Sequence, residues 1–259
     1  MFVGSENANK GWMHMRSGEA IRDSRKKRYI IAASVAIPIV IFALYSTAQS
    51  EPYRNSKIWN FMSPKEKTGM SCGAYCVVPP APNFAFVNML GQQEKGSWIV
   101  QPDETDASEP NVLAKLPSIG SGSGYHLAIA PGGTYSEFQA SVRFKIISGE
   151  QRVAGLVLRF QDVNHYFVLL ADAMNHKFSL CRAQTGFQGL VCTEDKDVNI
   201  TPGQWHSIRA EVAGQGIAGY LDGVRLLQRN DQNYMGGGPI GLFTKGDSSV
   251  YFHDLKVLY

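Results

Sequence analysis

The sequence predicts an all-β protein, a two-sheet antiparallel sandwich, preceded by a single transmembrane helix. Three observations support this prediction. Gly and Pro are plentiful, with 26 and 12 among 259 residues, and charged residues make up only 18%, which suits a chain with many turns. Stretches that alternate apolar and polar residues recur from about residue 96 onward, as in half-buried strands. One earlier run, 29–48, carries no charge, as a membrane span requires.

The transmembrane prediction depends on the length of this run and on its flanking charge. The run "YIIAASVAIPIVIFALYSTA" has 20 residues and, at about 1.5 Å per residue, spans about 30 Å as a helix. The basic stretch "RKKR" precedes it directly, so the positive-inside rule places the tail 1–28 in the cytoplasm. We therefore expect a single-pass protein of the inner or cell membrane, with a periplasmic or extracellular C-terminal domain. A cleaved signal peptide is the alternative, but the polar N-terminal region and the apolar run are both long for one.

Several residues are expected to contact the membrane or a partner. Pro38 lies in mid-helix, and Tyr29 and Tyr45 lie where interfacial aromatics are found. Residues 49–95 are predicted to be a connector, extended around "CVVPPAPNFAF". A connector that packs on a partner and a flexible stalk both fit. The expected contact residues are Trp12, Tyr29, Pro38, Tyr45, Trp59 and Phe61.

The charge distribution excludes nucleic-acid binding by the folded part. Residues 1–28 hold seven basic and three acidic side chains, which leaves 18 basic and 19 acidic side chains in the rest. A nucleic-acid-binding domain needs a basic surface, and a nearly neutral domain does not supply one.

The four cysteines predict disulfide chemistry. Cys181 and Cys192 flank "RAQTGFQGLV", so we expect a disulfide across a hairpin in an oxidising compartment. Cys72 and Cys76, in "CGAYC", could close a tight loop or pair with a partner chain. A metal or haem role is disfavoured, because no C-x-x-C pair and no C-x-x-C-H occurs.

The sandwich is expected over 96–259. "SEFQASVRFKII" has period two, "AGLVLRF" and "YFVLLADA" form a pair, and "KFSLCRA" pairs with "GLVCTE". "WHSIRAEVAG" and "GIAGYLDGVRLLQ" follow, with Asp222-Gly223 as a hairpin turn, and "GPIGLFTKGDSSVYFHDLKVLY" supplies the last two strands. We expect ten to twelve strands and no amphipathic helix.

The order of these stretches resembles the concanavalin A-like jelly-roll domains. It is closest to the bacterial 3-keto-disaccharide hydrolase-like branch, with laminin G-like domains as cousins. The motifs are "AGLVLRFQDVNHYFVLL", "TPGQWHSIRAEVAGQGIAGYLDGVRLL" and "GPIGLFTKGDSSVYFHDLKV". The resemblance implies a jelly roll but leaves function open between glycan binding, glycoside cleavage and protein docking. The closing motif has His253-Asp254 where relatives usually have two acidic residues.

No stretch looks catalytic. Retaining glycosidases need two carboxyl groups about 5 Å apart, and the densest acidic run, "TEDKD", reads as a solvated loop. Asp162 and Asn164, beside His165, are weak candidates for binding calcium or a sugar, but Asp and Asn are also the usual turn residues. "GSGSG" is followed by a strand, so it is not a phosphate loop.

The remaining histidines also look structural. Trp205 and His206 should point to opposite faces of a strand, with Trp205 expected in the core and His206 at the surface or satisfied by neighbours. We expect the same structural role for His126 and His253. We therefore expect no catalytic residue, no cofactor and no firm metal site.

Three functions remain. The leading hypothesis is a non-catalytic accessory subunit that docks on a larger membrane complex, such as a photosynthetic or respiratory assembly, with the lipid bilayer and other subunits as partners. The alternative is an extracytoplasmic glycan-binding module. The third is a hydrolase of keto-sugar glycosides, implied only by the family resemblance.

Overall fold

The fold is taken from a computed structural model, which describes residues 53–59, 61, 83–89, 97–103, 111–117, 124–185, 189–233 and 236–259. These residues belong to one compact unit, Glu51–Tyr259. The predicted tail and helix, with Trp12, Tyr29, Pro38 and Tyr45, lie outside the described residues, as do Cys72 and Cys76. Within the described ranges, no helix is long and apolar enough to cross a membrane.

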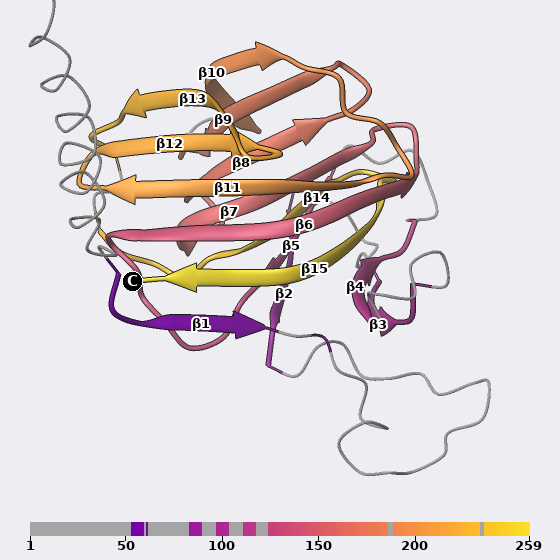
Figure 1. The fold of residues 1–259 in the computed structure, drawn as a ribbon, viewed down its shortest axis with the longest axis horizontal. Helices are drawn as coiled ribbons and strands as arrows, with labels where there is room; N and C mark the ends of the chain where they lie inside the picture. The colour runs from indigo at the N-terminus through magenta and orange to yellow at the C-terminus, as the bar shows by residue number, and fades with distance from the viewer. Residues whose placement is uncertain are drawn as a thin grey trace, which may run out of the picture. The chain divides into compact units, whose positions relative to one another are not determined.

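Fifteen strands in the described residues build two antiparallel sheets that lie one behind the other (Figure 1). Sheet A contains, in spatial order, β13 (Val224–Asn230), β12 (Gly216–Leu221), β11 (Trp205–Ala213), β6 (Phe138–Ser148), β15 (Ser249–Leu258), β4 (Val112–Lys115) and β3 (Trp98–Gln101), and β1 (Ser56–Trp59) also pairs with β15. Sheet B contains β10 (Leu190–Asp197), β9 (Lys177–Ala183), β8 (His165–Asp172), β7 (Val153–Asp162), β14 (Gly241–Lys245), β5 (Tyr125–Ile129) and β2 (Ala85–Met89). The predicted two-sheet antiparallel sandwich is confirmed.

Strand β6 shows how the sequence builds the core between the sheets. Its alternate residues Phe138, Ala140, Val142, Phe144 and Ile146 are all buried in this core. Burying one such aromatic side chain contributes roughly 1.5–3 kcal/mol. The residues between them must face away from the core, because successive side chains of a strand point to opposite faces.

Two predicted local features are present. Asp222 and Gly223 have φ angles of 49° and 80°, and they connect β12 to β13 where Leu221 pairs with Val224. A two-residue turn with both φ angles positive suits a tight hairpin. The predicted disulfide is also confirmed, because Cys181 and Cys192 lie opposite each other on β9 and β10 and are bonded.

The sandwich begins earlier in the chain than expected, because β1 and β2 both lie within 49–95. Phe61 is buried in the core, with its ring centre 6.0 Å from that of Phe84. Trp59 packs against the same core. Both residues were expected to contact the membrane or a partner, and the structure instead uses them to attach β1 to the sandwich.

Sheet B carries a second hydrophobic cluster on its other face. Leu127, Val157, Tyr166, Val168 and Phe243 are buried in this cluster, while their strand neighbours belong to the core between the sheets. We call this face the outer face of sheet B. It is apolar, in contrast to the outer face of sheet A.

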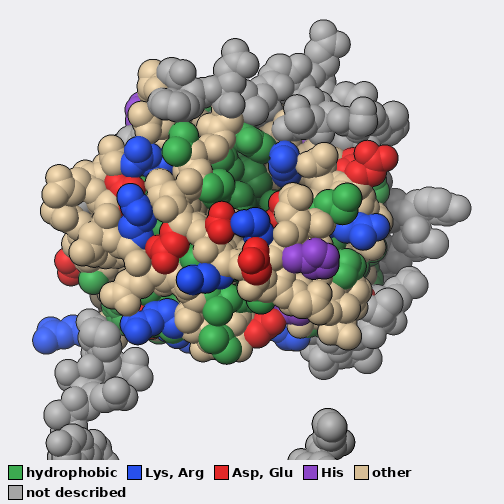
Figure 2. Space-filling model, turned by 90° about the horizontal axis from the view of Figure 1, so that it is seen from above, with side chains coloured by type: hydrophobic (Ala, Val, Ile, Leu, Met, Phe, Trp, Pro, Cys, Tyr) green, Lys and Arg blue, Asp and Glu red, His purple; other side chains and the backbone are tan. Residues whose placement is uncertain are grey.

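The edge strands β10 and β13 lie at the top of Figure 1, and Figure 2 looks down on them. Side chains of both charges are interspersed across this view, and hydrophobic side chains gather in a hollow in its upper half. Charged edge strands oppose pairing with another chain. Edge strand β10 reads "LVCTEDKD", so the acidic run predicted to be a solvated loop is a charged edge strand.

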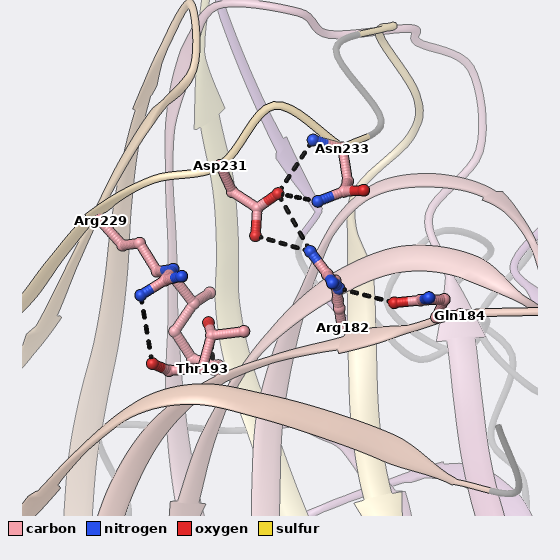
Figure 3. A network of polar contacts seen from close by, with 7 residues as sticks. Arg182, Gln184, Thr193, Arg229, Asp231 and Asn233 are labelled. Carbon is pink, nitrogen blue, oxygen red and sulfur yellow. Dashed lines mark hydrogen bonds and ion pairs between the residues drawn. The ribbon is translucent and has the colours of Figure 1, made fainter.

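A polar network links the two sheets at this edge (Figure 3). Arg182 of β9 donates through Nη1 to Asp231, at 3.0 and 3.2 Å from the two carboxylate oxygens. Asp231 follows β13 and is nearly buried, and it also accepts hydrogen bonds from Asn233. Burial alone would raise the pKa of Asp231, but the hydrogen bonds from Asn233 and the charge of Arg182 together lower it.

Candidate functional site

The outer face of sheet A holds aromatic and charged side chains close together. Arg143 and Lys145 alternate with the core residues of β6, so they lie on this face. The strand register places Trp205 of β11 and Tyr251 of β15 directly opposite Lys145, one on each side. Opposite residues share a face of the sheet. We use the name Lys145 cluster for these four residues together with two others. Its members are Gln101, Asp103, Arg143, Lys145, Trp205 and Tyr251.

Lys145 lies at the centre of the cluster. Its Nζ is 4.8 Å from the centre of the Trp205 ring and 5.8 Å from that of Tyr251, within the range of cation–π attraction. It also forms an ion pair with Asp103, and both side chains are buried. A buried ammonium without a counter-charge is strongly unfavourable. The carboxylate of Asp103 therefore allows Lys145 to lie between the two rings.

Two further side chains complete the cluster. The Arg143 guanidinium lies 4.9 Å from the centre of the Trp205 ring. Gln101 Nε2 donates a 2.7 Å hydrogen bond to the Tyr251 hydroxyl. The half-buried Trp205 ring thus has cationic groups beside it, and the Tyr251 hydroxyl is held at a fixed position.

A second polar group lies further along the same face. The Arg209 guanidinium stacks 3.5 Å from the centre of the Tyr220 ring and pairs with Glu211. The Tyr220 hydroxyl donates to Glu211 Oε2 at 2.7 Å. Burial and this hydrogen bond to Glu211 raise the pKa of Tyr220, so the phenol stays protonated and able to donate.

The two carboxylates engaged on this face are far apart. Asp103 lies beside Lys145, which pairs with Trp205, whereas Glu211 pairs with Gln139. Lys145 and Gln139 are six residues apart on β6, which corresponds to about 20 Å at the usual rise of a strand. Glycosidases that use two carboxyl groups hold them about 5–10 Å apart. Asp103 at one end and Glu211 at the other do not meet this requirement.

The positions of Trp205 and His206 are the reverse of those expected. Trp205 lies on the outer face, because Ile208, Ala210 and Val212 of the same strand fill the core. His206 points inward at the strand end, with its ring centre 5.6 Å from that of Phe144. The prediction that Trp205 is a core residue is therefore wrong.

His206 is satisfied by its neighbours, as expected. Its Nδ1 lies 2.7 Å from Asp222 Oδ2 and its Nε2 lies 3.1 Å from the Thr201 carbonyl oxygen. Asp222 also accepts the Ser207 backbone N–H, so this aspartate ties the β12–β13 turn to β11.

Asp162 and Asn164, the weak candidates for binding calcium, form hydrogen bonds within the turn between β7 and β8. Asp162 Oδ1 accepts the backbone N–H of Asn164 at 2.7 Å, and both its oxygens lie within 2.9 Å of His165 Nδ1. The hydrogen bond with His165 lowers the pKa of Asp162. His165 Nε2 in turn lies 3.1 Å from Thr185 Oγ1. Within the described ranges, no group of three or more His, Cys, Asp or Glu residues is placed to hold a metal ion.

His126 lies between the sheets and is buried. Its Nδ1 is 2.9 Å from Asn88 Oδ1, and burial, aided by the charge of Lys115, lowers its pKa to about 4. Burial also lowers the pKa of Lys115 to about 8, and its Nζ donates to the carbonyls of Gly246 and Ser248. These groups fix the end of the core, away from the outer face of sheet A.

The chain belongs to the 3-keto-alpha-glucoside-1,2-lyase-like domain family, whose model matches residues 90–258. This match confirms the family resemblance that the sequence motifs indicated. A search of curated proteins found no match.

Several solved structures are similar to this chain at low sequence identity. A carbohydrate-binding module from Bacillus subtilis is 16% identical, with a TM-score of 0.51 over 68% of this chain and 98% of the module. A Bacillus subtilis protein of unknown function with a galectin-like fold is 10% identical, with a TM-score of 0.49 over 68% and 89%. Domain 4 of an extracellular arabinanase from Geobacillus stearothermophilus, solved with arabinotriose, is 11% identical, with a TM-score of 0.46 over 68% and 81%.

These findings correct the leading functional prediction. We expected an accessory subunit that docks on a larger membrane complex, and this prediction is wrong. The chain belongs to a family named for an enzyme domain that acts on glucosides, and a carbohydrate-binding module shares its fold. The predicted alternative, a glycan-binding module, fits these findings better.

No sequence pattern indicates the Lys145 cluster. Its members come from β3, β6, β11, β15 and the residues just after β3, and no local motif joins them. Only the register between distant strands brings them together.

Proposed function

We propose that the domain binds a glycan on the outer face of sheet A, at the Lys145 cluster. The observation that carries the proposal is the pair of rings, Trp205 and Tyr251, on either side of the buried and paired Lys145. The family of the chain and the fold it shares with a carbohydrate-binding module support this choice.

The chemistry of the cluster suits a sugar. One face of a sugar ring is lined by C–H groups, which pack on an aromatic ring, while its hydroxyls need hydrogen-bond partners in place of water. Trp205 supplies an apolar surface, and the guanidinium of the partly buried Arg143 supplies donors. Asp103 orients Lys145 before any ligand arrives, which reduces the entropy lost on binding.

The proposal extends to location. The predicted helix 29–48 would hold the domain at the outer side of the membrane. The disulfide between Cys181 and Cys192 supports an oxidising compartment. Extracellular or periplasmic polysaccharides are then the accessible ligands.

The test is a glycan array probed with the full-length chain, in a detergent without a sugar headgroup, followed by titration calorimetry with the best ligand. We expect Trp205→Ala to raise Kd at least about tenfold, equivalent to about 1.4 kcal/mol, because buried aromatic anchors dominate binding. Tyr251→Phe keeps the ring but loses the bond to Gln101, and we expect a smaller rise in Kd. Met174→Ala, on the exposed β8–β9 turn, is the matched control and should bind as the wild type does.

Three results would count against the proposal. The first is that no glycan binds to the folded chain. The second is that Trp205→Ala and Met174→Ala bind equally well. The third is turnover of a 3-keto-glucoside that survives Trp205→Ala, which would place the activity elsewhere.

A further inference from the structure

We propose that Asn199 is an N-glycosylation site, to which an oligosaccharyltransferase attaches a glycan. Asn199-Ile200-Thr201 is the one N-x-S/T sequence in the chain with a residue other than proline in the middle, and this is the acceptor pattern for N-glycosylation. The inference is independent of the glycan-binding proposal. It concerns a sugar attached to the protein rather than one that the protein binds.

The segment around Asn199 lies in a loop where an enzyme can reach it. The segment lies between β10, which ends at Asp197, and β11, which begins at Trp205, so its backbone is not tied into a sheet ladder. Ile200 is buried in the core, whereas Asp197 and Asn199 are exposed. The buried Ile200 anchors the loop to the core, and Asn199 beside it points toward solvent.

The acceptor groups are available. Among the described residues, no hydrogen bond engages the Asn199 side chain or the Thr201 hydroxyl, while the Thr201 backbone N–H donates to His206 Nε2. A transferase can therefore bind the hydroxyl and the amide without breaking a hydrogen bond of either group. Asp197, two residues before the asparagine, has a side chain that is 91% exposed, with an oxygen 3.7 Å from Lys177 Nζ. An acceptor groove with arginine side chains would bind this carboxylate by a charge-assisted hydrogen bond.

The reaction needs a co-substrate, a polyprenyl-diphosphate-linked oligosaccharide. The Asn199 side-chain nitrogen attacks C1 of the first sugar and a C–N bond forms. The C1–O bond to the diphosphate breaks, the diphosphate leaves with the electron pair, and the amide nitrogen loses one proton. No oxidant or reductant is required.

The test expresses the full-length chain in cells that hold an active oligosaccharyltransferase and its lipid-linked donor at the outer side of the membrane. Cells with an inactive transferase are the control. A second acceptor sequence at the C-terminus reports whether the domain has reached the enzyme. We expect intact-mass spectrometry to show one added glycan beyond the one on the reporter, and fragment spectra to place it on Asn199.

Variants separate recognition from folding. Asn199→Gln should abolish the added mass, and Asp197→Ala should lower the occupied fraction severalfold. Asn175→Gln, at another exposed turn, should change nothing. Modification of the reporter but not of Asn199 would overturn the proposal, and so would absence of both, because the domain would then not reach a transferase.

Discussion

The outer faces of the two sheets differ in chemistry, although each is one side of an antiparallel sheet of similar size. On sheet B this face is a buried apolar cluster that includes Val168 and Phe243. On sheet A it carries Trp205, Lys145 and Tyr251 with their polar partners. A polar group is kept buried only where partners compensate it. The comparison therefore indicates a structural role for the outer face of sheet B and supports the proposal that the outer face of sheet A binds a ligand.

The sharpest test of this comparison places the same charge on each face. Val168→Asp buries a carboxylate in the apolar cluster of sheet B, and we expect a loss on the order of 5 kcal/mol in unfolding free energy or failure to fold. Ser141→Asp, on the outer face of sheet A between Arg209 and Lys256, should change stability by less than about 1 kcal/mol. Urea unfolding of both variants measures the difference, and equal losses would refute the comparison.

The second prediction concerns the buried ion pair on sheet A. Asp103→Ala leaves Lys145 buried among aromatic rings, and we expect a loss of about 3–5 kcal/mol in unfolding free energy. The double variant Asp103→Leu with Lys145→Met removes both charges and should recover most of this loss, while glycan binding stays weak. If the double variant is as unstable as the single one, the pair does not compensate as described.

The third prediction addresses the disulfide, which joins β9 to β10 on sheet B. Replacing both Cys181 and Cys192 with alanine opens a loop with a sequence separation of 11, and should lower stability by about 3 kcal/mol. Glycan affinity should be unchanged, because the bond lies on the other sheet. Calorimetry under conditions where the variant is folded measures this affinity. A fall in glycan affinity would contradict the prediction and show that the disulfide on sheet B affects binding on sheet A.

The smallest expected effect is the pH dependence of the contact between the sheets. The pKa of Asp231 in the folded protein is below its ordinary value of 3.8. Its stabilising effect is therefore complete above the unfolded pKa and is lost as pH falls through the folded pKa. Asp231→Asn should cost about 1–2 kcal/mol at pH 7, and this difference from the wild type should shrink as pH falls below 3.8 and through the lowered folded pKa. A difference independent of pH would exclude the ionic contribution.

Local patterns predicted much of the fold. Period-two alternation located β6, Asp222-Gly223 located a hairpin turn, and the spacing of Cys181 and Cys192 indicated their pairing. Each of these signals involves residues that are close together in the sequence, so each can be recognised without knowing the three-dimensional structure.

The candidate site could not be predicted in the same way. Tyr251 and Trp205 flank Lys145 because of pairings between strands far apart in sequence, and no local pattern encodes that register. The error at Trp205 has a different cause. A large aromatic ring was expected to be buried, but Ile208, Ala210 and Val212 already identify the inward positions of β11. The strand's own alternation was the better guide.

The central place of β15 in sheet A has a consequence for how the protein folds. In the β6–β15 pairing, Phe252 lies opposite Phe144, 108 residues earlier. Such distant pairing raises contact order, and domains dominated by it fold in milliseconds to seconds rather than microseconds. During synthesis, β6 emerges well before β15, and the unpaired edge of β6 can associate with other chains until β15 arrives. The order of the strands along the chain therefore exposes this domain to aggregation while it is being made.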